Sequence, residues 1–396
     1  MFTPDKRLLD EIDRIAGEVF ELSLCLTDHP EISGEEKESS AAVIKFLQNH
    51  GYHVEAPYGG INYSFRAAPE GANPALPRIA ILCEYDALPD IGHGCGHSLS
   101  CGVSILTALA LRSAAPDLEA VIELVGTPAE ETVGGKVIMS ENGAFNGYAL
   151  AILSHLDNDN VPQSRILASN DMYVTFFGKT AHASANPWDG INAWNAAQLF
   201  AHAADMLRQH LTPDCQLHGI VINGGAAPNI VPDKVEIEYY LRSATISGLT
   251  SLWEKLETCA KGAAIATGCT YTAKQRYGTY ADLFYPQSAV EVFIEIYQAF
   301  GYKYRIEEKP AGSSDVGNVD LVTPTLAPYV SATDHFISLH TTEFAEALRG
   351  DRGMRTLLEG TRIQAAFLLE TIRRPGLLDR IRAEHRAYRD SQKNCP

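Results

Sequence analysis

The stretch RIAILCEYDALPDIGHGCGHSLSCG, residues 78–102, contains the transition that decides the fold. Its first part is short, apolar and β-branched, and it ends at Glu84 and Asp86. This pattern predicts a buried strand whose carboxyl end emerges at the two acids. A glycine-rich loop follows, and the apolar residues after the loop predict a buried helix. Strand, polar loop and helix in this order indicate an α/β sheet, in which ligand sites lie at the carboxyl ends of the strands.

Two more apolar runs end in polar residues. AVIELVGTPAEE, residues 120–131, ends at Glu130 and Glu131, and YALAILSHLDND, residues 148–159, predicts a third strand that ends in His155. Because the carboxyl ends of such strands meet at one edge of the sheet, the pattern predicts one site built from distant segments.

The hydrophobic pattern of the chain changes twice. From about Ser169 the sequence alternates, with helices expected over residues 188–210 and 250–266, and the order β-α-β-β-α-β matches a ferredoxin-like module with one exposed sheet face. From about Pro286 the helical and buried-strand pattern of the first part returns. We therefore expect an α/β domain with a mixed, mainly parallel sheet, formed by residues 1–168 and 284–396, and an inserted α+β domain at residues 169–283.

The composition of the chain argues against several classes of function. A formal net charge of −17 argues against binding of the nucleic-acid backbone, which needs clustered Lys and Arg. No apolar stretch is long enough to span a membrane, and the N-terminal residues lack the apolar core of a signal peptide, so we expect a cytoplasmic protein. The eight cysteines have no framework spacing, which predicts free thiols.

The glycine-rich loop carries Cys95 and His97, with Gly94 and Gly96 beside them. Such a loop can fold tightly enough for a thiolate and an imidazole to reach one ion, and zinc accepts this mixture of donors. A glycine-rich turn that happens to contain the two residues is the alternative. A redox pair with Cys101 is disfavoured, because the two cysteines do not have the C-x-x-C spacing and Cys101 lies in the apolar helix. No G-x-S-x-G elbow of a serine hydrolase follows a strand.

The adjacent acids Glu130 and Glu131 point in different directions at the end of a strand, so one can bind metal while the other accepts a proton from water. Two solvated acids at the start of a loop are the alternative. His155, and His340 in SLHTTEF, are each compatible with an ordinary polar role. If both join Cys95, His97 and Glu131, the donors exceed what one tetrahedral zinc needs, and a two-metal site with a shared ligand would use them.

Seven motifs together resemble the M20 metallopeptidases, in particular their amidohydrolase branch. They are spread over nearly the whole chain in the order HPEISGEE, EYDALPDIGHGCGH, GTPAEE, GKTAHASANPWDGINA, NGGAAPNIVPD, GSSDVGNV and HTTEF. The resemblance implies that Glu130 is the general base and that Asp86 orients a ligand. Glu84 stands where other branches have a histidine ligand, and Cys95 would supply the missing donor. The implied metal ligands are Cys95, His97, Glu131, His155 and His340.

For the inserted domain the resemblance implies a lid that also forms a homodimer. His182 would stabilise the tetrahedral oxyanion, often in the active site of the partner subunit. Asn229 and Arg242 would bind polar groups and the carboxylate of the substrate, and residues 312–315 would form a loop that contacts it.

The expected reaction is metal-assisted hydrolysis of the amide bond of a small N-acyl amino acid or dipeptide. It would use two divalent ions, for which zinc comes first and manganese and cobalt remain open. The alternatives are a hydrolase of p-aminobenzoyl-glutamate-type amides, transfer to an acceptor other than water, and a non-catalytic binding homologue.

Overall fold

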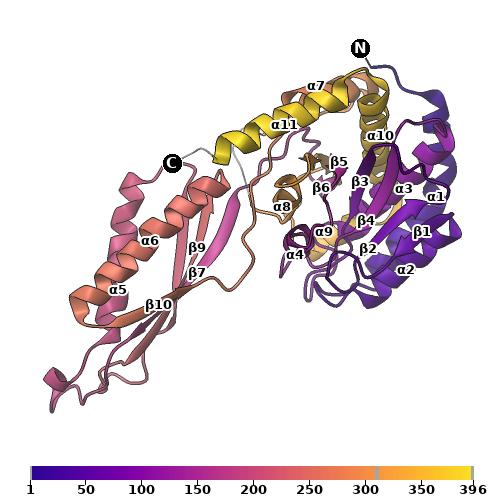
Figure 1. The fold of residues 1–396 in the computed structure, drawn as a ribbon. Coiled ribbons are helices and arrows are strands. Elements are labelled where there is room, and N and C mark those ends of the chain that lie inside the picture. Colours follow the sequence, from indigo (N-terminus) through magenta and orange to yellow (C-terminus); the bar gives the residue numbers. More distant parts are fainter. Residues whose placement is uncertain (1, 308–311, 394–396) are drawn as a thin grey trace. The chain divides into compact units, whose positions relative to one another are not determined.

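The computed structural model describes residues 2–307 and 312–393. The chain divides into two compact units, one built from the residues up to 165 and from 283 onwards (unit 1), the other from residues 166–282 (unit 2). Figure 1 follows the chain through both. Among the described residues, no helix combines the length and the apolar character needed to cross a membrane.

Unit 1 is built around a six-stranded sheet. Four strands run parallel to one another, β4 (Val121–Gly126), β3 (Arg78–Cys83), β5 (Tyr148–Ile152) and β11 (Thr325–Leu326). Two antiparallel strands, β2 (Phe65–Pro69) and β1 (Tyr52–Glu55), extend it beyond β4. The sheet is thus mixed and mainly parallel, which confirms the predicted fold class.

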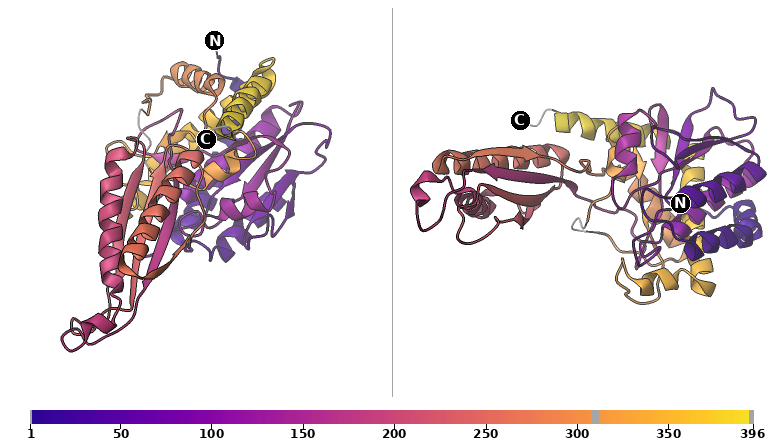
Figure 2. Two further views of the ribbon diagram at one scale, coloured as in Figure 1. Left: turned by 60° about the vertical axis from the view of Figure 1, so that its left-hand side comes forward. Right: turned by 90° about the horizontal axis from the view of Figure 1, so that it is seen from below.

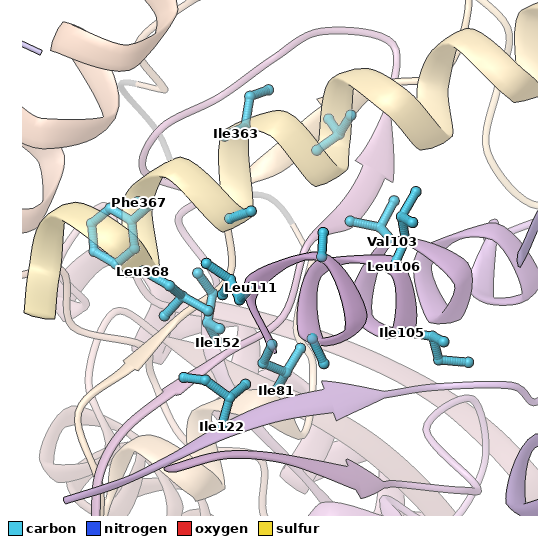
Figure 3. Packing of buried hydrophobic residues seen from close by; sticks show 14 of the residues in the cluster. Ile81, Val103, Ile105, Leu106, Leu111, Ile122, Ile152, Ile363, Phe367 and Leu368 are labelled. Atoms are coloured by element: carbon cyan, nitrogen blue, oxygen red, sulfur yellow. The ribbon is translucent and has the colours of Figure 1, made fainter. Parts of the chain in front are cut away.

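Helices pack on this sheet because the contact buries the apolar faces of the helices and of the sheet. The helix predicted after the glycine-rich loop is α3 (His97–Ala114), and nearly all of its residues, including Cys101, are buried. It lies between the sheet and α10 (Gly350–Arg373), with α1 (Lys6–Asp28) also in contact (Figure 3). The other helices of unit 1 are α2 (Lys37–Asn49), α4 (Gly135–Glu141), α7 (Gln287–Phe300), α8 (Val316–Asp320), α9 (Thr342–Ala347) and α11 (Leu377–Lys393).

The third strand differs from the prediction. β5 ends at Ile152, and His155 instead opens a short strand, β6 (His155–Asp157), which pairs in parallel with β12 (Tyr329–Ser331). The reason is a change of partner. Ile152 is the last residue of β5 that pairs with β3. Beyond it, the chain pairs with the segment that follows β11, and the His155 N–H donates to the Pro328 carbonyl at 3.1 Å.

Unit 2 has the predicted order β-α-β-β-α-β. Its antiparallel sheet has the strand order β10 (Thr270–Lys274), β7 (Ala168–Phe177), β9 (Lys234–Ser243) and β8 (Gln216–Asn223). The two helices, α5 (Ala193–Leu207) and α6 (Ile246–Thr267), lie along this sheet (Figure 2).

The ends of these helices differ from the predicted ranges because of local capping. A 3₁₀ turn at Pro187–Asp189 precedes α5. The helix itself begins after Asn192, whose side chain caps it by accepting a hydrogen bond from Trp194 N. α6 begins four residues before Thr250, because the Thr245 hydroxyl caps it at Gly248 N.

The core of unit 1 should be sensitive to truncation at Phe367. This side chain is fully buried and stacks on Phe293, with ring centroids 4.1 Å apart. We expect Phe367→Ala to lower the free energy of unfolding by about 3–5 kcal/mol, measured by urea denaturation. Phe336, whose side chain is 80% exposed, is the matched control, and Phe336→Ala should change stability by less than about 0.5 kcal/mol. Equal effects would mean that the stacked pair does not stabilise the core.

Candidate metal centre

Polar side chains gather where the parallel strands of unit 1 end. Glu84 and Asp86 directly follow β3, and Glu130 and Glu131 follow β4. The glycine-rich loop then leads into α3, whose first residue is His97. The carboxyl ends of parallel strands form a crevice of this kind in open α/β sheets, where loops supply the functional groups.

The structure brings five predicted ligands together, and we call them the donor cluster: Cys95, His97, Glu131, His155 and His340. Cys95 belongs to two groups of three, one with His97 and His155 and one with Glu131 and His340, and within each group the donor atoms lie within 4.8 Å of one another. Its Sγ is 3.5 Å from His155 Nε2 and 3.4 Å from His340 Nε2. A shared central donor is the arrangement that a two-metal site needs.

Glycines on both sides of Cys95 allow this close approach. A Cβ atom at Gly94 would meet the Ile91 side chain at 2.7 Å and the His340 Cα at 3.3 Å. At Gly96, where φ is +86°, it would meet Leu156 at 2.7 Å. The loop can therefore pack against β6 and against the His340 segment only without these side chains.

Asp86 holds two members of the donor cluster. Its Oδ1 lies 2.9 Å from His97 Nδ1, and its Oδ2 accepts from Glu131 N at 3.0 Å. Burial alone would raise the pKa of Asp86, but His97 and the Glu131 N–H outweigh burial and hold it well below its usual range. An acceptor at Nδ1 fixes the imidazole tautomer and leaves Nε2 as the lone-pair donor.

Buried atoms without hydrogen-bond partners show that this cluster suits a cation. His97 Nε2 and Glu131 Oε1 are buried and have no hydrogen-bond partner among the described residues. His155 Nδ1 donates to the Leu156 carbonyl at 2.9 Å, so its Nε2 also faces Cys95 as a lone pair. One sulfur, three imidazole nitrogens and a carboxylate form a donor set that zinc accepts.

Glu130 belongs to two groups whose donor atoms lie within 4.8 Å of one another. One joins it to His97 and Glu131 of the donor cluster, and the other joins it to Glu84 and Asp315 (the oxygen cluster). Burial raises the pKa of Glu130 well above its usual range, and the charges of Asp315 and Glu84 add to this effect. Lys136 Nζ lies 2.6 Å from Glu84 Oε1 and 2.7 Å from Asp315 Oδ1.

Glu36 and Lys136 are functional candidates that sequence reasoning missed. Glu36 is fully buried, and its Oε1 accepts from Gly34 N at 2.8 Å and from Ala129 N at 2.7 Å. It thereby holds Ala129 at φ +64°, next to Glu130. The available signals were the acid in HPEISGEE and a lysine among apolar residues in GGKVIM.

The residues predicted in unit 2 fall into two places. His182 and Asn229 lie on adjacent segments, joined by a bridge between His182 and Ile230 and by the Ala183 N–H donating to the Asn229 carbonyl at 3.0 Å. Arg242 lies near the far end of β9, a strand of ten residues that spans roughly 30 Å. One small substrate cannot reach both places within one copy of unit 2.

His182 is exposed, and its hydrogen bonds leave Nε2 as the hydrogen-bond donor of the ring. Its Nδ1 accepts from Ser184 N at 3.3 Å and from Ala185 N at 3.2 Å. A ring nitrogen that accepts in the neutral imidazole leaves the other to carry the proton, so Nε2 is the donor.

Comparisons with known proteins identify the family to which the chain belongs. The peptidase dimerisation domain of the M20 group matches residues 169–267. The Xaa-Arg dipeptidase of Mus musculus is 33% identical, over 96% of this chain and 91% of that protein. One of the p-aminobenzoyl-glutamate hydrolase subunits of Escherichia coli (strain K12) is 28% identical, over 61% of this chain and 54% of that protein.

A solved structure has the same fold. It is a dinuclear metal binding peptidase of the M20 family from Bacillus subtilis, with a TM-score of 0.70 and 19% identity, covering 91% of this chain and 100% of that one. The chain therefore belongs to the M20 family of peptidases and amidohydrolases, which confirms the resemblance of its motifs.

Cys95 should make metal binding depend on pH. Burial raises the pKa of its thiol well above the usual range, so the thiol is protonated at neutral pH in the metal-free protein. Only the thiolate binds metal, so binding must release the thiol proton of Cys95. Release of this one proton should make zinc affinity rise by about tenfold for each pH unit.

Calorimetry of zinc binding in buffers of different ionisation enthalpy measures the released protons. On binding zinc, the Cys95→Ser variant should release about one proton fewer than the wild type. The control variant Cys25→Ser, at an exposed cysteine of α1, should release as many protons as the wild type. Equal release by the Cys95 variant and the wild type would exclude Cys95 as a ligand.

Proposed function

We propose that the chain is a metal-dependent dipeptidase or amidohydrolase that cleaves the amide bond of a small dipeptide or N-acyl amino acid. The observation that carries this proposal is the convergence of the donor cluster beside Glu130, in which His97 Nε2 and Glu131 Oε1 are buried without a hydrogen-bond partner among the described residues. Two divalent ions, zinc first and manganese or cobalt as alternatives, would be held by Cys95, His97, Glu131, His155 and His340. When bound, they would supply polarisation of the scissile carbonyl and a more acidic water.

Glu130 acts as the general base in this proposal. It takes the proton of the attacking water and passes it to the leaving amine. A carboxylate with a raised pKa is a stronger base than an ordinary carboxylate, so it accepts the proton of the attacking water more readily. Asp86 fixes the tautomer of His97 and the backbone of Glu131, so that the neighbouring base keeps its direction.

Unit 2 contributes polar groups to the substrate. His182 Nε2–H donates to the oxyanion that develops at the scissile carbonyl, while Asn229 and Arg242 bind polar groups and the carboxylate. Because His182 and Arg242 lie far apart in one copy, the two sets serve the sites of two copies in a homodimer.

We place a dipeptide first among the substrates. The Mus musculus relative, which aligns over nearly the whole chain, is an Xaa-Arg dipeptidase. A net charge of −17 also favours a substrate with a cationic side chain. Aryl-glutamate amides come second, because the Escherichia coli relative aligns over 61% of this chain.

The first test joins metal analysis with a cleavage assay. We expect about two divalent ions per chain and release of amino acid from Xaa-Arg dipeptides, lost on chelation and restored by zinc, manganese or cobalt. N-acyl amino acids and aryl-glutamates in the same panel rank the substrates. Glu130→Gln should lower kcat by about 10²–10⁴-fold and keep its metal. A protein that stays inactive with every metal would leave a binding homologue as the better explanation.

The homodimer should depend on β8. This strand forms an edge of the sheet in unit 2 and exposes Ile220, Val221 and Ile222, and an exposed apolar edge strand pairs readily with another. We expect Ile220→Asp combined with Ile222→Asp to produce monomers in size-exclusion chromatography with light scattering. Ile265→Asp, on the 73% exposed position of α6, should leave the dimer intact. Dimers of the β8 variant would place the interface elsewhere.

A further inference from the structure

The oxygen cluster already contains a cation. Lys136, in the first turn of α4, is fully buried, and so are Glu84 and Asp315. Its ammonium contacts Glu84 Oε1 at 2.6 Å and Asp315 Oδ1 at 2.7 Å, while its backbone N–H donates to Asp315 Oδ2 at 2.9 Å. Side chain and main chain of one residue thus hold the same carboxylate.

Three carboxylates this close need a positive charge. Glu84, Glu130 and Asp315 offer oxygens within 4.8 Å of one another, which is an all-oxygen donor set of the kind that Mg²⁺ and Ca²⁺ prefer. Buried charges without compensation strongly destabilise a fold. The second oxygen of Glu84, Oε2, has no hydrogen-bond partner among the described residues and lies 3.6 Å from His97 Nε2. The oxygen cluster therefore adjoins the donor cluster directly.

The two clusters differ in chemistry. The donor cluster offers sulfur and imidazole nitrogen, which suit zinc, and the oxygen cluster offers carboxylates alone. We propose that Lys136 is a built-in cation that takes the place of a divalent ion in the oxygen cluster and so confines metal to the donor cluster. The inference rests on the proposed metal site, and it makes Lys136 a residue that sets how many ions the protein binds.

A purely structural ion pair predicts something different. Loss of Lys136 would then only lower stability, and added cations would not restore it. If Lys136 stands in for a divalent ion, its loss opens a site for one, and the new ion replaces the lost charge.

The test uses Lys136→Met in the full chain, loaded with zinc. Equilibrium dialysis with elemental analysis measures bound Mg²⁺ or Ca²⁺, and thermal unfolding is followed with and without these ions at millimolar concentration. We expect the variant to bind about one Mg²⁺ or Ca²⁺ per chain that the wild type does not bind, and its Tm to rise with the ion.

Two further variants sharpen the result. Lys136→Arg keeps the positive charge and should bind no additional ion. Lys136→Met combined with Glu84→Gln removes one carboxylate with the lysine, and it should fold without added ions and lose the new site. Absence of Mg²⁺ and Ca²⁺ binding by Lys136→Met would overturn the proposal, and so would a variant that stays unfolded at every ion concentration.

The two proposals can fail separately. A wild-type protein that binds no zinc and cleaves no amide would refute the proposed function. The gain of Mg²⁺ or Ca²⁺ by Lys136→Met is measured without substrate, and so it reports on the oxygen cluster alone.

Discussion

Compensation of buried negative charge is the constraint on which unit 1 depends. Glu36, Glu84, Asp86 and Asp315 are all withdrawn from water at the end of the parallel strands. Each of them contacts a backbone N–H, an imidazole or the Lys136 ammonium. A carboxylate in such a place costs several kcal/mol if it is left alone. The local fold is therefore arranged around these contacts as well as around apolar packing.

The segment between β4 and α4 illustrates this arrangement. Three buried carboxylates hold three of its backbone N–H groups: Glu36 holds Ala129, Asp86 holds Glu131, and Asp315 holds Lys136. The side chains of Glu130 and Glu131 both approach His97, and beyond it Glu131 reaches Cys95 and His340 while Glu130 reaches Glu84 and Asp315. A turn fixed at three points loses little further entropy when a ligand arrives, which is how preorganised sites gain their strength.

Much of this was predictable from the sequence, and the rest was not for physical reasons. The apolar runs before Glu84 and Glu130 marked strands, and polar residues after such runs marked the edge where the site lies. Lys136 gave no comparable signal, because Asp315 stands 179 residues further along the chain. The strand break before His155 was equally hidden, since it depends on where β3 stops pairing. Local patterns indicate elements, whereas charge partners and strand partners are set by tertiary contacts.

His340 is the last residue of the donor cluster to be synthesised. It stands 245 residues after Cys95, and its backbone N–H reaches the Gly94 carbonyl at 2.9 Å. During synthesis the ribosome delivers Cys95, His97, Glu131 and His155 first, then the whole of unit 2, and only then this last imidazole. Domains fold as they emerge, so unit 2 has its sequence complete while unit 1 still lacks its final strands and helices. The proposed metal centre can thus be completed only after most of the chain has been made, and binding of the full set of proposed ions would be one of the last events of its maturation.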